Sequence, residues 1–345
     1  MTTITLLTDY KGYFESKHKT PVYRSGFETE KLESALTEMN YQVQTLPFTE
    51  IDFLNNDYSN QLFLYTSSED PGYYYKSYIE DVILALAQTG AIVIPAYNFL
   101  RANNNKVFME FLRQNTKNEG INSLRSRHYG TIEEFNKHNH EFPKVVKESV
   151  GAISAGVRLA RNKKHAQKQI KKLIYVPQFK YYVYDWLRKF KHKNYIPDSK
   201  YRKKFIVQDF VPGLKNDWKI YFFGEKLYIW YRFTRDNDFR ASGSGKFLFN
   251  EEVPVPHGLF DFAQEVYKQF DIPFISIDIG WDGKVFYLFE MQFVYFGKNG
   301  HFHSTHYYEK EYNTWVKKEN TNEIETVYAE SIHGFISNKY KNVYV

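Results

Sequence analysis

The chain has 345 residues, of which 43% are hydrophobic and 25% are charged, a composition typical of a folded protein with an apolar core and not of a disordered or collagen-like chain. Cysteine is absent, which excludes disulfide bonds, thiolate metal ligands and a cysteine nucleophile. The net charge of +6 is small for a chain of this length, so nucleic acid is not an expected partner.

The N-terminus has no basic segment followed by a long apolar run, so we expect no signal peptide and a cytoplasmic protein. The most apolar window, residues 82–100, is interrupted by Gly90 and Pro95. This pattern indicates a helix, a turn and a strand, and we expect no membrane span.

Residues 1–100 alternate between strand and helix patterns. Strands are expected at 4–8, 42–46, 61–66 and 91–96, and helices at 29–40 and 78–88. This order and spacing predict a small open α/β domain, and the nearly continuous apolar run at 91–96 is typical of a parallel sheet.

The remainder of the chain changes character twice. A helix is expected at 104–113, a strand at 144–147 and a helix at 163–173, followed by a stretch with eight Lys or Arg between residues 188 and 204. From residue 205 the pattern is rich in strands, expected at 205–210, 218–223, 226–233, 274–280 and 285–293, with one helix at 258–270. The polar tail from residue 301 has no clear pattern.

Two lysines stand next to segments suited to binding phosphate. Lys106 begins the helix at 104–113, and Lys147 ends the strand at 144–147. The loop after Lys147 is rich in small residues, which let backbone N–H groups approach an anion closely. These small residues are Ser149, Gly151, Ser154 and Gly156.

Four segments in order carry a resemblance to a known superfamily. They are N-N-N-K-V-F-M-E-F-L at 103–112, P-K-V-V-K-E-S-V-G-A-I-S-A-G-V at 143–157, V-Q-D-F-V-P-G-L-K-N-D-W-K-I at 207–220 with D-F-R-A-S-G-S-G at 238–245, and I-S-I-D-I-G-W-D-G-K-V-F-Y-L-F-E-M-Q-F at 275–293. Over about residues 103–296 the chain resembles the ATP-grasp superfamily of carboxylate–amine ligases, and within it the ribosomal-S6-type glutamate ligases.

The resemblance implies an α/β fold with an α+β core and five regions. These are an N-terminal open α/β domain at 1–100, a connecting helix region at 101–125, a lid subdomain at 126–205, an antiparallel core subdomain at 206–300 and a C-terminal extension at 301–345.

The resemblance also implies roles for individual residues. Lys106 and Lys147 match the lysines that hold ATP phosphates, and residues 149–157 match a lid loop over them. The adenine hinge corresponds to Gln208, Asp209, Phe210 and Val211, and the ribose-contacting acid to Asp217. Arg240 matches the arginine that steadies the transferred phosphoryl group, and Asp278, Glu290 and Gln292 match the magnesium ligands.

Three further residues are candidates for substrate binding: Arg232, Arg235 and Ser242. Arg232 and Arg235 could bind an acidic substrate, although surface charges on a strand are the alternative. The sequence departs from the pattern of its relatives at four places. Ser242 and Gln292 each replace Asn, Lys219 stands where many relatives have Arg, and the loop after Ser242 lacks the paired glycines of the relatives at their usual place.

The magnesium ligands pose a geometric condition. Asp282-Gly283 marks a hairpin turn between the strands that carry Asp278 and Glu290. A two-residue loop would point these carboxylates to opposite sides of the sheet. A three-residue loop, Trp281–Gly283, with Gly283 in a left-handed bulge places Asp278, Glu290 and Gln292 on one face, so a metal site here requires the bulged turn.

The implied activity is ligation of a carboxylate to an amine through an acyl phosphate, using ATP and Mg²⁺ (or Mn²⁺) and releasing ADP and phosphate. The carboxylate would be a small molecule or sugar acid, and the acceptor an amine or amino acid. Two alternatives stay open, an ATP-dependent phosphotransferase and a non-catalytic module that binds nucleotide or polyanion. Homo-oligomerisation is also left open.

His301, His303 and His306 lie close together in the tail. On a strand His301 and His303 would share a face, a spacing found among metal ligands, whereas a solvated or substrate-contacting loop is the alternative.

Overall fold

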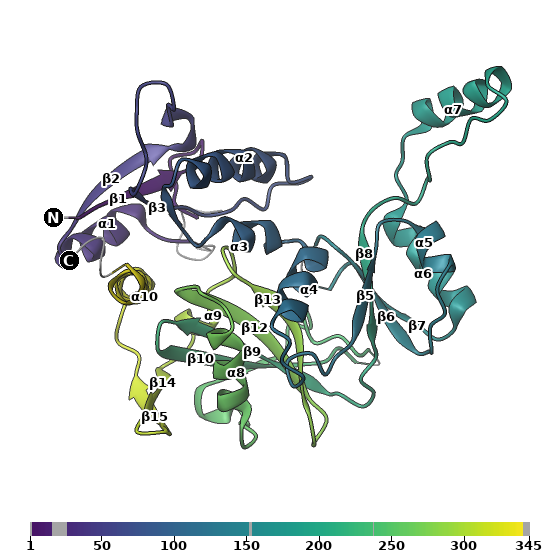
Figure 1. Cartoon of the computed structure of the whole chain (residues 1–345). Coiled ribbons are helices and arrows are strands. Elements are labelled where there is room, and N and C mark those ends of the chain that lie inside the picture. Colours follow the sequence, from purple (N-terminus) through teal and green to yellow (C-terminus); the bar gives the residue numbers. More distant parts are fainter. Residues whose placement is uncertain (1, 16–25, 152–153, 237, 341–345) are drawn as a thin grey trace. The chain divides into compact units, whose positions relative to one another are not determined.

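The computed structural model describes residues 2–15, 26–151, 154–236 and 238–340. The chain forms two compact units. The first comprises Met1–Asn103 and Leu214–Val345, and the second comprises Asn104–Gly213. Figure 1 labels the elements of both units.

The first unit begins with a four-stranded parallel sheet in the order β2-β1-β3-β4. The sheet and its helices are β1 (Thr2–Thr8), α1 (Thr29–Glu38), β2 (Tyr41–Pro47), the 3-10 turn η2 (Phe48–Glu50), β3 (Leu62–Leu64), α2 (Tyr74–Gln88), β4 (Ile92–Ile94) and α3 (Tyr97–Ala102). The predicted open α/β arrangement of this segment is therefore confirmed.

The same unit contains a seven-stranded sheet in the order β13-β12-β9-β10-β14-β15, with β11 also paired to β10. All of its strand pairs are antiparallel. Its elements are β9 (Asn216–Phe223), β10 (Lys226–Phe233), β11 (Phe247–Phe249), η3 (Asn250–Glu252), α8 (Leu259–Lys268), β12 (Phe274–Trp281), β13 (Phe286–Gln292), α9 (Asn299–Phe302), β14 (His306–Glu311), β15 (Thr314–Glu319) and α10 (Ile324–Lys339).

One apolar core joins these two sheets. It takes in Leu6 of β1, Leu36 of α1, Tyr228 of β10 and Ile332 of α10, all of them buried. Helix α10 packs against α1, and the purple and yellow ribbons in Figure 1 show the beginning and the end of the chain side by side in this unit. The C-terminal segment is thus part of the core of the first unit.

The second unit is built on a four-stranded antiparallel sheet in the order β5-β8-β6-β7. Its elements are α4 (Lys106–Asn115), β5 (Ser126–Tyr129), α5 (Ile132–Asn136), β6 (Lys144–Glu148), β7 (Val157–Ala160), α6 (Lys163–Ile174), α7 (Phe179–Lys191) and β8 (Phe205–Asp209). Helices α5 and α6 cover one face through a cluster that includes Phe135, Ile170, Val146 and Val207.

Among the described residues, no helix is both long and apolar enough to cross a membrane.

The tail from residue 301 is where the sequence pattern was least informative. The structure forms β14, β15 and α10 there, and the buried side of α10 includes the polar residues Glu325 and Ser331, which obscure an apolar stripe. The hypothesis that His301 and His303 share a strand face is wrong, because His301 lies in α9 and His303 follows that helix.

The predicted three-residue turn between β12 and β13 is also wrong. Trp281 pairs with Phe286, so the loop has four residues, and Asp282 accepts hydrogen bonds from the N–H groups of Lys284 and Val285 at 2.8 and 2.9 Å. The irregularity of the register lies further along, between Asp278 and Ile279. The hydrogen bonds to Asp282 favour the four-residue loop. The bulge after Asp278 then shifts the register by one residue, so that Asp278 pairs with Glu290.

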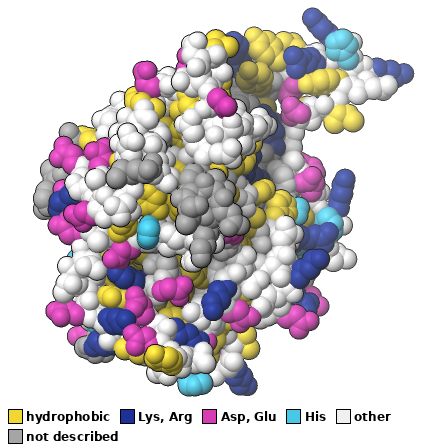
Figure 2. Space-filling model, turned by 60° about the vertical axis from the view of Figure 1, so that its left-hand side comes forward, with side chains coloured by type: hydrophobic (Ala, Val, Ile, Leu, Met, Phe, Trp, Pro, Cys, Tyr) yellow, Lys and Arg dark blue, Asp and Glu magenta, His cyan; other side chains and the backbone are white. Residues whose placement is uncertain are grey.

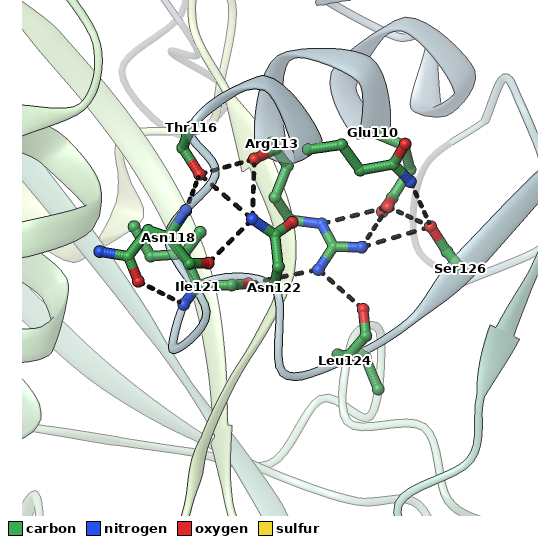
Figure 3. A network of polar contacts seen from close by, with 9 residues as sticks. Glu110, Arg113, Thr116, Asn118, Ile121, Asn122, Leu124 and Ser126 are labelled. Atoms are coloured by element: carbon green, nitrogen blue, oxygen red, sulfur yellow. Dashed lines mark hydrogen bonds and ion pairs between the residues drawn. The ribbon is translucent and has the colours of Figure 1, made fainter.

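A buried ion pair fixes α4 to the loop that follows it (Figure 3). Arg113 and Glu110 are each 1% exposed, and the Arg113 Nε donates to Glu110 Oε2 at 3.1 Å. The Arg113 Nη1 donates to the carbonyl oxygens of Leu124 and Ile121 at 2.7 and 3.2 Å. One guanidinium therefore binds both an oxygen of a buried carboxylate, Oε2 of Glu110, and the backbone of the loop that leads to β5.

Replacing Arg113 with Ala is expected to lower the free energy of unfolding by about 3 kcal/mol or more, because Glu110 would stay buried without its partner. Urea titrations followed by circular dichroism measure the loss. Arg161→Ala, at an exposed position, is the control and should change stability by less than about 0.5 kcal/mol. Equal stability of the two variants would contradict this role of Arg113.

Candidate active site

In the second unit, Lys106 lies against the small-residue loop. Its Nζ donates to the Gly151 carbonyl oxygen at 2.9 Å, and its N–H donates to the Ser149 carbonyl oxygen at 2.8 Å. Asn105 caps α4 through Phe108, and the Ser149 hydroxyl donates to Asn105 Oδ1 at 3.1 Å. The helix N-terminus and the loop therefore form one hydrogen-bonded assembly.

The small-residue loop connects β6 to β7. Gly151 and Ser154 have positive φ, +114° and +56°, and the Gly156 carbonyl oxygen accepts from the N–H of Glu148 at 2.9 Å. A Cβ at Gly156 would lie 2.9 Å from the Cβ of Glu148, so glycine is needed where the loop returns. Residues 152 and 153 of the expected lid loop lie outside the described residues.

Lys147 and Gln208 lie on the same face of this sheet, the face opposite α5 and α6. Lys147 pairs with Ile206, and Val145 pairs with Gln208, whereas Val146 and Val207 point into the core beneath α5 and α6. Lys147 is 8% exposed and Gln208 is 2% exposed.

Gln208 carries a polar group that the described structure leaves unsatisfied. Its side-chain Nε2 is buried and finds no hydrogen-bond partner among the described residues. Because a buried amide donor without a partner is costly, this group indicates a place where a ligand acceptor could bind.

The expected hinge, Gln208 to Val211, runs from the end of β8 toward β9. The Asp209 N–H donates to the Arg125 carbonyl oxygen at 2.9 Å, and the Asp209 carboxylate forms an ion pair with Lys144. Phe210 and Val211 follow the strand, and their roles stay predictions.

In the first unit, strand register brings the remaining candidates to one face of the large sheet. Asp278 pairs with Lys219 on one side and with Glu290 on the other, and Ser276 pairs with Gln292. Directly paired residues point to the same side of a sheet. Asp278, Glu290 and Gln292 therefore share a face, as predicted, although the turn that produces this is different.

Ion pairs connect the charges on this face. Arg232 donates from Nε and Nη2 to the two carboxylate oxygens of Asp217 at 2.6 and 2.8 Å, and its Nη2 lies 2.7 Å from Asp278 Oδ2. The Lys219 Nζ donates to Asp278 Oδ1 at 3.1 Å and to Gln292 Oε1 at 2.9 Å. All four charged residues are less than a tenth exposed.

These contacts determine the ionisation of Asp278. Burial by itself would raise the pKa of Asp278, but Arg232 and Lys219 outweigh burial and lower it to about 2. Asp278 is therefore a carboxylate at neutral pH. Arg232 is held by two carboxylates, so it is a buried charge of this face and not a surface charge.

The oxygen donors of this face suit Mg²⁺ on the condition that nucleotide phosphates and water complete its coordination shell. Among the described residues no cluster of three or more His, Cys, Asp and Glu could hold a metal ion. Mg²⁺, however, commonly takes one or two carboxylates and completes its shell with phosphates and water. Asp278 and Glu290, directly opposed on β12 and β13, supply such a pair, with the Gln292 amide oxygen beside them.

Arg235, Arg240 and Ser242 lie in the loop between β10 and β11. The Arg240 guanidinium binds Asp238, with Nε 2.8 Å from Oδ2, and the Arg235 Nη2 donates to the Ser242 carbonyl oxygen at 3.0 Å. The hydrogen bonds from Arg240 lower the pKa of Asp238. Arg235 and Arg240 therefore make contacts within this loop itself.

The first unit also has a pocket of about 250 Å³, which lies at the carboxyl ends of β1 and β3. Its polar lining includes the carboxylates of Asp9, Glu15, Glu69 and Asp70 and the hydroxyls of Thr66 and Ser67. The two hydroxyls are buried and have no hydrogen-bond partner among the described residues. The carboxyl ends of parallel strands are where ligands commonly bind in open α/β sheets.

Sequence reasoning missed two features of these sites. Lys219 was noted only as a departure from the pattern of the relatives, yet it contacts Asp278 and Gln292 together. The pocket residues Thr66 and Ser67 gave no signal, because a Thr-Ser pair after a strand is common in ordinary turns.

No protein-family model matches the chain, and no curated protein matches it. Solved structures are similar over nearly the whole length. A D-cycloserine synthetase has a TM-score of 0.53 and 12% identity, covering 96% of this chain and 99% of that one. An ATP-grasp ligase in complex with a phosphomimetic variant of a minimal precursor, Mg and ADP has a TM-score of 0.52 and 10% identity, covering 97% and 99%.

A third similar structure is a macrocyclase from Microcystis aeruginosa bound with a precursor peptide. It has a TM-score of 0.51 and 9% identity, covering 95% of this chain and 98% of that one. At these identities the likeness is one of fold. The protein is a mixed α/β protein with a parallel and two antiparallel sheets, and its fold is the ATP-grasp fold, as the sequence resemblance predicted.

Proposed function

We propose that this protein is an ATP- and Mg²⁺-dependent ligase that joins a carboxylate to an amine and releases ADP and phosphate. The observation that carries the proposal is the buried charged face of the large sheet, where Asp278 and Glu290 are directly opposed within an ATP-grasp fold. Two carboxylates opposed at this position, one buried and one half-buried, form an oxygen donor pair of the kind that Mg²⁺ takes together with nucleotide phosphates.

Residues of the second unit are assigned to the nucleotide. Lys106 and Lys147 would neutralise phosphate charge, together with backbone N–H groups of the loop that begins at Ser149. The Nε2 of Gln208, which has no hydrogen-bond partner among the described residues, is consistent with a ligand acceptor close to it. The backbone groups of Asp209 and Val211 would contact adenine.

The reaction would occur in two steps. A substrate carboxylate oxygen attacks the γ-phosphorus of ATP, the bond to the β-phosphate oxygen breaks, and ADP leaves. The amine then attacks the acyl carbon, the bond to the phosphate oxygen breaks, and the amine nitrogen loses a proton. Arg240 would steady the transferred phosphoryl group after exchanging its Asp238 contact for it.

Mg²⁺ would be held by Glu290, Asp278 and Gln292, and when bound it neutralises charge on the phosphates. Lys219 and Arg232 keep Asp278 ionised in the absence of any ligand. Asp217 is fully engaged with Arg232 here, so a ribose contact would share that carboxylate.

The pocket at the ends of β1 and β3 is assigned to the amine substrate. Among the described residues, four acidic side chains line it, those of Asp9, Glu15, Glu69 and Asp70, against one basic side chain, that of Lys11. Of the four, Glu15 forms an ion pair with Lys298. This charge favours a cationic amine over an acid. Thr66 and Ser67 would supply the hydrogen bonds that orient it.

The first experiment is a screen for ADP release with panels of amino acids, amines and sugar acids. We expect Mg²⁺-dependent ADP release that needs both a carboxylate and an amine, with an amide as the product. A phosphoester product would assign a phosphotransferase instead. Absence of turnover with every acceptor would leave only nucleotide binding and contradict the ligase.

Glu290→Ala is expected to abolish this turnover while leaving the fold intact, because a half-buried carboxylate assigned to Mg²⁺ is lost. Glu319→Ala, at an exposed position on β15, is the control and should keep full activity. Circular dichroism checks folding. Near-normal turnover by folded Glu290→Ala protein would remove Glu290 from the metal site.

Lys147→Met is expected to weaken ATP binding at least tenfold, or about 1.4 kcal/mol, because a charge-assisted phosphate contact is lost. Isothermal titration calorimetry measures the affinity. Lys163→Met, at the exposed start of α6, should bind ATP as the unchanged protein does. Equal affinities of all three proteins would refute the assignment of Lys147.

Glu69→Gln is expected to raise the KM for the amine about tenfold without changing the KM for ATP, because one negative charge of the pocket is removed. Glu50→Gln, exposed and outside the pocket, serves as the matched control. A change in the KM for ATP alone would place Glu69 at the nucleotide.

A further inference from the structure

Helix α7 is the least buried helix of the second unit. Figure 1 shows it standing away from the sheet and from α5 and α6, at the end of an arm between α6 and β8. None of its thirteen residues is buried. The arm is independent of the residues assigned to the reaction.

The exposed residues of α7 form an apolar stripe. Phe179, Val183, Trp186 and Phe190 are spaced at intervals of four, three and four residues, so they lie on one face of the helix. They are 80%, 41%, 60% and 74% exposed. Ile196, in the loop that returns from the helix, is also exposed. Large apolar side chains exposed together mark an interaction surface.

Positive charge surrounds this stripe. Residues 175–204 contain nine Lys or Arg and two Asp, a net charge of +7 that exceeds the +6 of the whole chain. Lys180 and Lys191 flank the stripe on one side, and Lys189 flanks it on the other. In Figure 2 the protruding arm at the upper right shows hydrophobic and Lys or Arg side chains next to one another.

The arm is anchored at its base, so the stripe is presented in a defined orientation. Tyr175 and Tyr201 form an isolated antiparallel bridge, and the Arg202 Nη2 donates to Gln178 Oε1 at 2.6 Å. At the far end the Tyr195 hydroxyl donates to Asp185 at 2.5 Å. The polar side of α7 thus makes contacts within the arm, and the apolar stripe is left to a partner.

We propose that α7 binds the surface of a membrane rich in anionic lipid, with the apolar stripe in the interface and the basic residues at the headgroups. A helix with Phe and Trp on one face and Lys and Arg around it has the composition of an interfacial helix. Aromatic rings are favoured at the boundary of the bilayer, and a helix of thirteen residues is too short to span one.

Charge and shape argue against other occupants. A second copy would bring one arm of charge +7 against another, which repulsion disfavours. A protein groove would have to match the shape of a projecting helix, whereas a bilayer needs no shape complementarity. The basic flanks select anionic lipid over neutral lipid.

The test is co-sedimentation of the full-length protein with vesicles of phosphatidylcholine, with and without about 30% phosphatidylglycerol. We expect at least tenfold tighter binding to the anionic vesicles, and weaker binding when salt rises from about 0.1 M to about 0.5 M. Brominated lipid should quench the fluorescence of Trp186, and the quenching should be absent in Trp186→Phe.

Matched variants separate the stripe from the rest of the helix. Trp186→Ser and Phe190→Ser should each weaken vesicle binding at least tenfold. Tyr181→Ser, 59% exposed on the opposite face of α7, should leave it unchanged. Because these side chains are exposed, folding is expected to persist, and circular dichroism checks it.

Three results would overturn the proposal. The first is equal binding to neutral and anionic vesicles, or none to either. The second is a concentration-dependent dimer that Trp186→Ser abolishes, without vesicle binding, which would assign the stripe to a second copy. The third is binding to poly-glutamate but not to vesicles, with loss in the same variants, which would assign it to an acidic protein. ATP turnover plays no part in these readouts, so they are independent of the proposed ligase.

Discussion

The large sheet depends on pairing buried charges that would otherwise be costly. Asp217 and Asp278 carry two negative charges and Lys219 and Arg232 two positive ones, and each is less than a tenth exposed. An unpaired charge at this depth costs several kcal/mol, so the strands must keep the register that joins them. Pairing of Asp278 with Lys219 fixes β12 against β9, and pairing of Asp217 with Arg232 fixes β9 against β10.

This constraint also defines the chemistry available on that face. Because Asp278 stays ionised between two cations, it is a ready oxygen donor, and Glu290 lies directly opposite it on β13. Any metal ion there would share Asp278 with an ammonium group 3.1 Å away. Lys219 would therefore be part of the proposed metal site.

Much of the fold was predictable because it follows local patterns. The alternation of strands and helices in residues 1–100 gave the parallel sheet, and the apolar strands after residue 205 gave the antiparallel one. Helix α10 was missed because its buried side includes Glu325 and Ser331. Helix α7 was missed because its aromatic and β-branched residues, such as those at 181–184, are as typical of strands as of helices.

The sequence by itself determined the ATP-grasp resemblance, the lysines at the start of α4 and near the end of β6, and the sharing of one strand face by Glu290 and Gln292, which are two residues apart. These follow from residue order and from the two-residue period of a strand. Only the tertiary structure decided that Asp278 lies on the same face as these two residues, through a four-residue turn and a bulge after Asp278. It alone joined Arg232 to Asp217 and Lys219 to Asp278, because contacts between strands depend on register and burial, which no local pattern encodes.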